Sequence, residues 1–316
     1  MKILANDGIS KSGQVALEAK GFTVDTTHVA QDQLVDYINN NQVEVLLVRS
    51  ATKVRQELID ETSLKIIGRG GVGMDNIDVD YARNKGILVI NTPASSSASV
   101  AEFVFAHLFG IVRNLHQANR TMPLEGDSNF NGLKKAYAKA FELRGKTMGV
   151  IGFGRIGVEV IKIALGLGMS VKVFDIVPVT KTIELDFFDG QKLSFELTST
   201  TLEDVIENSN FISVHVPSQN GYILGEKEIA KMKDGVVIIN TARGGVLDEK
   251  ALVDAIETGK VFGGALDVFE NEPTPEMGLL MNENLSFSPH IAGSTQEAQD
   301  RIGTELAQQI IEFYKK

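Results

Sequence analysis

Residues 147–157 read TMGVIGFGRIG, an apolar run followed at once by three glycines in the spacing G-x-G-x-x-G. The apolar run predicts a buried strand, and the apolar positions Val160, Ile161 and Ala164 beyond the glycines predict a helix. Between a strand and a helix, such glycines serve a tight turn, a close approach of the backbone to a pyrophosphate, and close helix–strand packing. The helix N-terminus adds amide donors and partial positive charge for the phosphates. This stretch therefore predicts a dinucleotide-binding unit.

The residue at the end of the following strand selects the dinucleotide. Asp175 stands at about the 20-residue distance from the glycines at which an acidic side chain accepts a hydrogen bond from a ribose 2′-hydroxyl. Its carboxylate would repel a 2′-phosphate, and no arginine follows in 174–180. NAD is therefore predicted rather than NADP, with an Asp175 that only caps a turn as the alternative. The residues predicted for this part of the site are Gly152, Gly154, Arg155, Ile156, Gly157 and Asp175.

The composition is that of an ordinary globular chain. With 316 residues, 43% of them hydrophobic, it is long enough for about two domains with a core in each. Its net charge of −10 argues against nucleic acid as a partner. Without cysteine, it has no disulfide, thiolate metal site or cysteine nucleophile, and no metal site is predicted. The longest apolar run, near 103–112, is shorter than the roughly 20 residues of a membrane span, and the N-terminus lacks a signal-peptide core. We expect a cytoplasmic protein with no membrane partner.

Working outward from the glycines, short strand-like runs alternate with helical stretches in both directions. The first series begins at Lys2, Phe22, Val43, Leu64 and Ile87, and the second at Thr147, Met169, Asn210, Gly235, Phe262 and Leu285. This alternation is typical of parallel sheets with helical crossovers, so we predict an α/β protein with two doubly wound parallel-sheet domains. A Rossmann NAD-binding domain at 97–287 is expected to be inserted into a flavodoxin-like substrate-binding domain formed by 1–96 and 288–316.

Two helices connect these domains in the predicted fold. The first, from about Ala98 to Leu115, carries apolar residues nearly all round its axis and must therefore be buried. On a monomer it would leave a large apolar patch in water, which favours a homodimer. The last helix, from about Ser294 to Tyr314, is amphipathic and is expected to return to the first domain.

Three polar residues follow successive predicted strands of the second series: Arg243, Glu272 and His290. The carboxyl edge of a doubly wound sheet is where ligands bind. Hydride transfer to or from an alcohol carbon needs a group that exchanges the hydroxyl proton, and histidine titrates in the useful range. A neighbouring carboxylate would orient the imidazole, and an arginine would bind a substrate carboxylate. Singly, each residue has a structural alternative: a surface cation, a solvated loop charge and a hydrogen-bonded structural histidine.

With these residues the chain resembles the D-isomer-specific 2-hydroxyacid dehydrogenases. The motifs that carry the resemblance are VIGFGRIG at Val150, Asp175, HVP at His215, INTARGGVLDE at Ile239, ALDVFENEP at Ala265 and SPHIAGST at Ser288. The resemblance implies that Arg243 binds substrate, that Glu272 orients the base and that His290 is the acid/base. The further cofactor-binding residues that it implies are His215, Val216, Pro217, Thr241, Ala242, Asp267 and Ala292.

Within that family the chain is most similar to members that act on a phosphorylated 2-hydroxy acid. The resemblance implies a loop at 69–73 whose backbone amides cradle the substrate carboxylate, with Arg49 and Arg69 near the phosphate. The substrate-binding residues that it implies are Arg49, Ser50, Arg69, Gly70, Gly71, Val72, Gly73 and Lys135, the last reaching a neighbouring subunit's site. A rim salt bridge is the alternative for Arg49. Because the chain ends soon after the last helix, we expect no serine feedback through a further domain.

Two other functions remain open from the sequence. One is the reduction of an unphosphorylated keto acid such as glyoxylate or hydroxypyruvate, or D-lactate-type chemistry. The other is NADH sensing by a corepressor-like protein, which an intact set of Arg243, Glu272 and His290 disfavours without excluding it. Turnover on phosphorylated and unphosphorylated substrates separates the first alternative, and tight NADH binding without turnover would favour the second.

Overall fold

The structure is a computed structural model that describes residues 1–315. The chain forms two compact units. Unit 1 comprises Met1–Ser97 and the described residues from Gly293 onward, and unit 2 comprises Ala98–Ala292. The backbone N–H groups of Ile291 and Ala292, just before the second boundary, donate to Asp267 within unit 2.

Unit 1 contains a five-stranded parallel sheet in the order β2-β1-β3-β4-β5. Its strands are β1 (Lys2–Ala5), β2 (Thr23–Asp25), β3 (Val43–Val48), β4 (Ile66–Arg69) and β5 (Leu88–Asn91). Its helices are α1 (Lys11–Glu18), α2 (Leu34–Asn40), α3 (Gln56–Asp60), α4 (Val79–Asn84) and α13 (Gln296–Tyr314), with a 3₁₀ turn at Gln31–Gln33. The strand order is that of flavodoxin-like folds, in which the order reverses beside the first strand.

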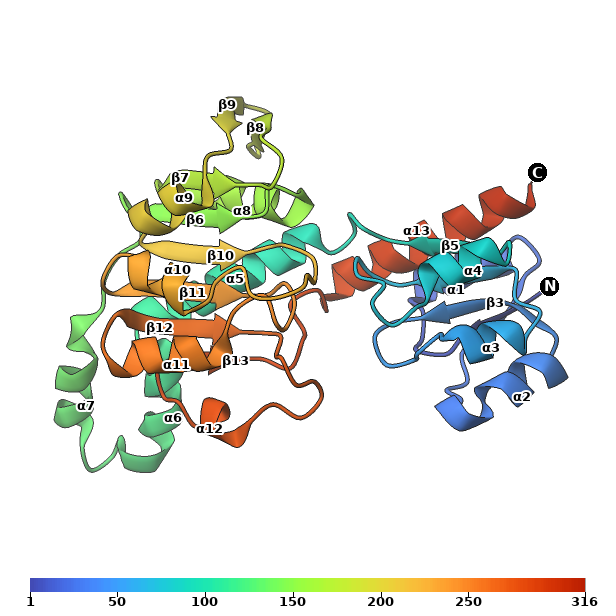
Figure 1. The fold of residues 1–316 in the computed structure, drawn as a ribbon, viewed down its shortest axis with the longest axis horizontal. Coiled ribbons are helices and arrows are strands. Elements are labelled where there is room, and N and C mark those ends of the chain that lie inside the picture. The colour runs from blue at the N-terminus through green and yellow to red at the C-terminus, as the bar shows by residue number, and fades with distance from the viewer. Residues whose placement is uncertain (316) are drawn as a thin grey trace. The chain divides into compact units, whose positions relative to one another are not determined.

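The last helix of unit 1 packs against its first. Helix α13 begins at the N-cap Thr295, whose hydroxyl accepts from the Ala298 N–H at 3.1 Å. Glycines allow the two helices to approach closely, since a Cβ at Gly13 would lie 2.6 Å from the carbonyl carbon of Gly303. Figure 1 shows α13 running beside α1.

Unit 2 contains a six-stranded parallel sheet in the order β13-β12-β11-β10-β6-β7. Its strands are β6 (Thr147–Ile151), β7 (Ser170–Phe174), β10 (Phe211–Val214), β11 (Val236–Asn240), β12 (Val261–Leu266) and β13 (Leu285–Phe287). Its remaining helices are α8 (Arg155–Gly166), α9 (Leu202–Asn208), α10 (Glu226–Lys231), α11 (Glu249–Glu257) and α12 (Met277–Leu280). The order reverses between β6 and β10, as in Rossmann folds. The predicted class, α/β with two doubly wound parallel sheets, is confirmed.

The apolar helix is shorter than predicted. Helix α5 (Ser97–Val112) stops before Asn114, which adopts a left-handed conformation with φ of 54°. Helices α6 (Leu115–Glu125) and α7 (Phe130–Ala136) and a 3₁₀ turn at Tyr137–Lys139 follow. Most apolar side chains of α5 enter the core beneath β6. Among the described residues, no single helix has the length and hydropathy to cross a membrane, although the pair α5 and α6, bent by 57°, would meet those two criteria together.

A hairpin that the sequence analysis did not predict follows β7. Strands β8 (Thr180–Asp186) and β9 (Lys192–Thr198) pair antiparallel and project from the β7 edge of unit 2 (Figure 1). The signal was present, because alternating polar and apolar residues flank the Asp-Gly pair at 189–190, a common hairpin turn. Gly190 has φ of 85°, which the turn requires.

Candidate active site

The glycine turn after β6 is shaped to bring a phosphate against the backbone. Gly152 has φ of 105°, and a Cβ there would lie 2.4 Å from the carbonyl oxygen of His215. A Cβ at Gly157 would lie 2.1 Å from the Gly152 oxygen, so α8 packs directly on the turn. By contrast, nothing lies within 4 Å of a Cβ at Gly154, the N-cap of α8, where no side chain caps the helix. Open space at an uncapped helix N-terminus fits a dinucleotide pyrophosphate.

Two charged residues form hydrogen bonds with the backbone of Phe153 inside this turn. One carboxylate oxygen of Asp175 accepts the Phe153 N–H at 2.8 Å, which leaves the other oxygen for a ribose hydroxyl. The ammonium of Lys181, on β8, donates to the Phe153 carbonyl and lies 4.8 Å from the centre of its ring. Sequence reasoning missed Lys181 because it comes from the unpredicted hairpin.

The three predicted catalytic residues follow adjacent strands whose carboxyl ends are aligned in the sheet. In the sheet register Asn240 pairs with Leu266, and Leu266 pairs with Phe287. Parallel strands in register end at one edge, so the segments carrying Arg243, Glu272 and His290 start side by side. The sequence placed these residues after β11, β12 and β13, and the structure makes those strands neighbours.

Glu272 and His290 form a hydrogen-bonded pair. The His290 Nδ1 lies 2.9 Å from the Glu272 Oε2, while the Glu272 Oε1 accepts the Phe269 N–H at 3.1 Å. The side chains of the two residues are 40% and 37% exposed, so a substrate can reach the imidazole. A carboxylate on Nδ1 fixes the ring and directs Nε2 outward as a proton-exchanging atom.

The Arg243 loop is held by a residue that sequence reasoning did not single out. The Asn240 side chain donates to the Arg243 carbonyl at 2.8 Å and accepts the Ala242 N–H at 3.0 Å. A Cβ at Gly244 would lie 1.8 Å from the Phe269 oxygen, so this loop packs on the segment that leads to Glu272. The Arg243 Nη1 donates to the Ala242 carbonyl at 2.6 Å. The sequence signal for Asn240 is an asparagine at the end of an otherwise apolar, buried strand.

His215 lies at the end of β10, beside the glycine turn. Its N–H donates to the Ile151 carbonyl at 2.7 Å, and its Nε2 lies 2.8 Å from the Ser213 hydroxyl. Burial lowers the pKa of His215 to about 3. A neutral imidazole matches a residue that lines a cofactor site through its backbone. The other residues predicted to bind cofactor in unit 2 lie at the same strand ends: Val216, Pro217, Thr241, Ala242, Asp267 and Ala292.

The predicted substrate residues of unit 1 lie at the ends of β3 and β4. The Asp7 carboxylate accepts the Arg49 N–H at 2.6 Å. Burial lowers the pKa of the Arg49 guanidinium, and Asp7 opposes that shift. Arg69 ends β4, and its Nη1 donates to the Gly70 carbonyl at 3.2 Å. The rest of the loop, Gly71, Val72 and Gly73, follows directly, and Ser50 is exposed next to Arg49. Lys135 is exposed on α7 in unit 2.

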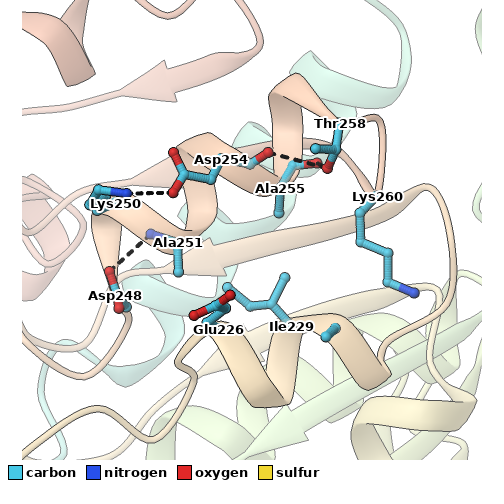
Figure 2. A pocket seen from close by; sticks show the side chains of 10 residues that line it. Glu226, Ile229, Asp248, Lys250, Ala251, Asp254, Ala255, Thr258 and Lys260 are labelled. Carbon is cyan, nitrogen blue, oxygen red and sulfur yellow. Dashed lines mark hydrogen bonds and ion pairs between the residues drawn. The ribbon is translucent and has the colours of Figure 1, made fainter.

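A further cavity of about 330 Å³ lies between α10 and α11 and contains none of the predicted site residues. Figure 2 shows three of its charged side chains engaged within α11 and its N-cap: Lys250 pairs with Asp254 at 2.6 Å, and Asp248 accepts the Ala251 N–H at 2.9 Å. Lys260 pairs with Asp234 at 2.8 Å. These pairs belong to helix capping and surface ion pairing, so the cavity adds no chemistry to the site.

The geometry agrees with comparisons with known proteins. Residues 105–292, almost the whole of unit 2, match the model of the D-isomer specific 2-hydroxyacid dehydrogenase NAD-binding domain. The chain is also 41% identical to a hydroxypyruvate reductase from Thermotoga maritima, over 98% of this chain and 97% of that protein. The chain belongs to the D-isomer-specific 2-hydroxyacid dehydrogenases. As a member of that family it is an oxidoreductase, and its cofactor is NAD.

Other 2-hydroxyacid dehydrogenases are similar over most of this chain. A D-3-phosphoglycerate dehydrogenase from Methanocaldococcus jannaschii is 39% identical over 98% of this chain, which spans only 57% of that protein. Among solved structures, a D-lactate dehydrogenase from Aquifex aeolicus, complexed with NAD and lactic acid, is 31% identical with a TM-score of 0.75. That match covers 100% of this chain and 96% of that one. The relatives agree on the family and differ in the substrate that they name.

Proposed function

We propose that the protein oxidises D-3-phosphoglycerate to 3-phosphohydroxypyruvate with NAD, the first step of serine biosynthesis. The observation that carries this proposal is the pair of arginines at one edge of the unit 1 sheet. Val48 pairs with Arg69 in the register of β3 and β4, and Arg49 follows directly. A Cβ at Gly70 would lie 3.7 Å from the Arg49 Cγ, so the two segments touch. Two guanidinium groups at one edge suit a phosphate with a charge near −2.

The site residues have distinct tasks in this reaction. NAD bound at the glycine turn supplies the acceptor for the substrate hydride. His290 takes the hydroxyl proton at Nε2, because Glu272 occupies Nδ1. Glu272 also stabilises the imidazolium that forms. Arg243 binds the substrate carboxylate, which orients the reacting carbon.

A second candidate is the reduction of unphosphorylated hydroxypyruvate. The relative from Thermotoga maritima favours it, because that hydroxypyruvate reductase is 41% identical to this chain. Both reactions need Arg243, Glu272 and His290. They differ in their need for Arg49 and Arg69, since hydroxypyruvate carries no phosphate.

A substrate comparison tests the proposal. NADH oxidation is measured by absorbance with 3-phosphohydroxypyruvate, hydroxypyruvate and glyoxylate, and kcat/KM should be highest for the phosphorylated acid. Arg49→Gln should lower kcat/KM for 3-phosphohydroxypyruvate by about 10- to 100-fold, the loss of a charge-assisted bond of about 1.5–3 kcal/mol, and leave hydroxypyruvate unaffected. Arg55→Gln is the control, since Arg55 pairs with Asp78 on the same unit. A wild-type preference for hydroxypyruvate would replace the proposal with the second candidate.

We also propose that the protein is a homodimer that pairs through α5 to α7. Large apolar side chains are exposed there: Phe109, Leu115, Met122, Leu124 and Phe130. Exposed large apolar side chains that gather on neighbouring helices favour an interface, and a twofold axis pairs identical surfaces with one another. Lys135, on α7, would then carry its ammonium toward the phosphate site of the partner.

A further inference from the structure

The backbone around His290 is held by one buried residue, Asp267. Three consecutive N–H groups end on it: His290 donates to its carbonyl at 2.8 Å, Ile291 to Oδ1 at 2.8 Å, and Ala292 to Oδ2 at 2.9 Å. His290 itself has φ of 54°, in the left-handed region that histidine rarely occupies. The surrounding structure must therefore impose this conformation, and Asp267, which is 1% exposed, supplies the bonds that do so.

Asp267 is linked in turn to helix α5. The Ser288 hydroxyl donates to the Asp267 Oδ1 at 2.6 Å, and the Ser288 oxygen lies 3.1 Å from the His107 Nε2. On its other side, the His107 Nδ1 lies 2.8 Å from the Ser286 hydroxyl. Every member of this chain lies in unit 2, and His107 and Ser288 are buried.

The proton positions follow from the partners. A carboxylate only accepts, so the single hydrogen of the Ser288 hydroxyl lies toward Asp267. The Ser288 oxygen must then accept from His107, which places a hydrogen on Nε2. Burial lowers the pKa of His107, against an opposing effect of Asp267 and with a smaller lowering from His116, which favours the neutral ring, and a neutral ring with its hydrogen on Nε2 has none on Nδ1. Nδ1 therefore accepts from Ser286.

We propose that His107 is a positioning residue for hydride transfer: as a neutral Nε2–H imidazole it orients the Ser288 hydroxyl onto Asp267 and so holds the His290 backbone in its left-handed conformation. The proposal rests on the assignment of His290 as the acid/base. It adds a role for α5, which carries none of the predicted catalytic residues. It also explains why a polar ring interrupts the apolar surface of α5 at this position.

The tautomer is tested directly on wild-type protein without substrate. In a ¹⁵N–¹H correlation spectrum of histidine-labelled protein, assigned with a His107→Gln sample, His107 should show a protonated Nε2 and an unprotonated Nδ1 at neutral pH. A protonated Nδ1, in either the neutral or the charged ring, would overturn the proposal. This measurement is independent of the substrate, so it is informative even if the proposed phosphoglycerate reaction fails.

Kinetics test the positioning role. His107→Leu removes the donor and Ser288→Ala breaks the link while removing one atom, so each should lower kcat by about 10- to 100-fold with the Kd for NADH little changed. His107→Gln retains an amide donor toward Ser288 and should recover most of the loss. His116→Gln is the control, because the contacts of that histidine are to the carbonyls of Gly110 and Glu283.

The variants also separate positioning from folding. If His107→Leu fails to fold, Ser288→Ala and His107→Gln still decide the question, with thermal unfolding recorded for each. Wild-type kcat in folded Ser288→Ala, or no recovery in folded His107→Gln relative to His107→Leu, would refute the role of His107.

Discussion

The Glu272–His290 pair carries the most direct chemical consequence of the structure. Because the carboxylate occupies Nδ1, the other ring nitrogen is the one that can exchange a proton with a substrate hydroxyl. Asparagine at position 290 keeps a polar group but has no titratable nitrogen. The His290→Asn variant therefore tests proton transfer separately from cofactor binding.

We predict that His290→Asn lowers kcat by about 10²- to 10⁴-fold, the usual contribution of general acid–base catalysis. The Kd for NADH, measured by fluorescence, should stay near the wild-type value, because the glycine turn at the end of β6 is unaffected. Turnover within a few-fold of wild type would remove His290 from the acid/base role. Loss of NADH binding together with turnover would instead indicate a structural defect.

A buried histidine predicts how stability depends on pH. The pKa of His215 is about 3 in the folded state against an ordinary 6.5, so the unfolded chain takes up a proton first as the pH falls. Its contribution to stability is complete above pH 6.5 and is lost at about 1.4 kcal/mol per pH unit as the pH falls below that value.

Urea unfolding at pH 7, 6 and 5 measures this effect. The free energy of unfolding should fall less steeply with acid in His215→Gln than in wild type, by up to about 1.4 kcal/mol per pH unit. Between pH 7 and 8 the two proteins should show the same dependence. Parallel curves from pH 7 to 5 would contradict the burial of a neutral His215.

At the scale of elements, the β8–β9 hairpin contributes a lysine to the glycine turn at which NAD is expected to bind. It delivers Lys181 to the carbonyl of Phe153, on the opposite side of that peptide from Asp175. The turn between Gly152 and Gly154 is thus fixed at both its N–H and its carbonyl. A fixed turn binds a dinucleotide better because less ordering accompanies binding.

We predict that Lys181→Met raises the Kd for NAD about tenfold, which corresponds to one charge-assisted bond of about 1.4 kcal/mol. Methionine retains the apolar stem over the Phe153 ring and removes the ammonium. Calorimetry of the protein without substrate gives the Kd. The control is Lys192→Met on the same hairpin, where the lysine pairs with Asp186, and its Kd should match wild type. An unchanged Kd in Lys181→Met would show that the turn is fixed without the lysine.

The elements also show what could be predicted from sequence. The strand and glycine turn at 147–157 were readable because their determinants are local. The hairpin was missed although Asp189-Gly190 signals it, because its residues look like an ordinary loop between β7 and α9. Helix α5 ends at Val112, before the predicted Leu115, and the left-handed Asn114 that follows it leaves no periodic signature in the sequence.

For the site, the sequence motifs alone indicate Arg243, Glu272 and His290. The supporting residues were beyond sequence reasoning, because their roles depend on bonds between distant positions. His107 and Ser288 are 181 positions apart, and each resembles an ordinary core residue when taken singly. Asn240 was passed over for the same reason: its two bonds to the Arg243 loop are visible only in the folded chain.

At the scale of the whole molecule, the proposed dimer can be broken by substitutions on the apolar surface of α6 and α7. Leu124→Glu and Phe130→Glu together place two charges on the apolar surface of α6 and α7, where burial of an unpaired charge is costly. Sedimentation should show a dimer for wild type and a monomer for the double variant. Phe188→Ser, which changes a fully exposed aromatic of the hairpin, is the control and should remain dimeric. A wild-type monomer would contradict the proposal.

The Gly13–Gly303 contact has a consequence for biosynthesis on the ribosome. The core of unit 1 includes Ile302, Leu306 and Ile310 of α13, which cover side chains such as Ile3 and Leu47 on the sheet. The N-terminal segment therefore emerges with this face of its sheet covered only in part, by Leu17 of α1, and the core is completed only when α13 has been synthesised. Unit 2, whose residues are contiguous in the sequence, can fold first. We therefore expect unit 2 to fold on the nascent chain before α13 completes the core of unit 1.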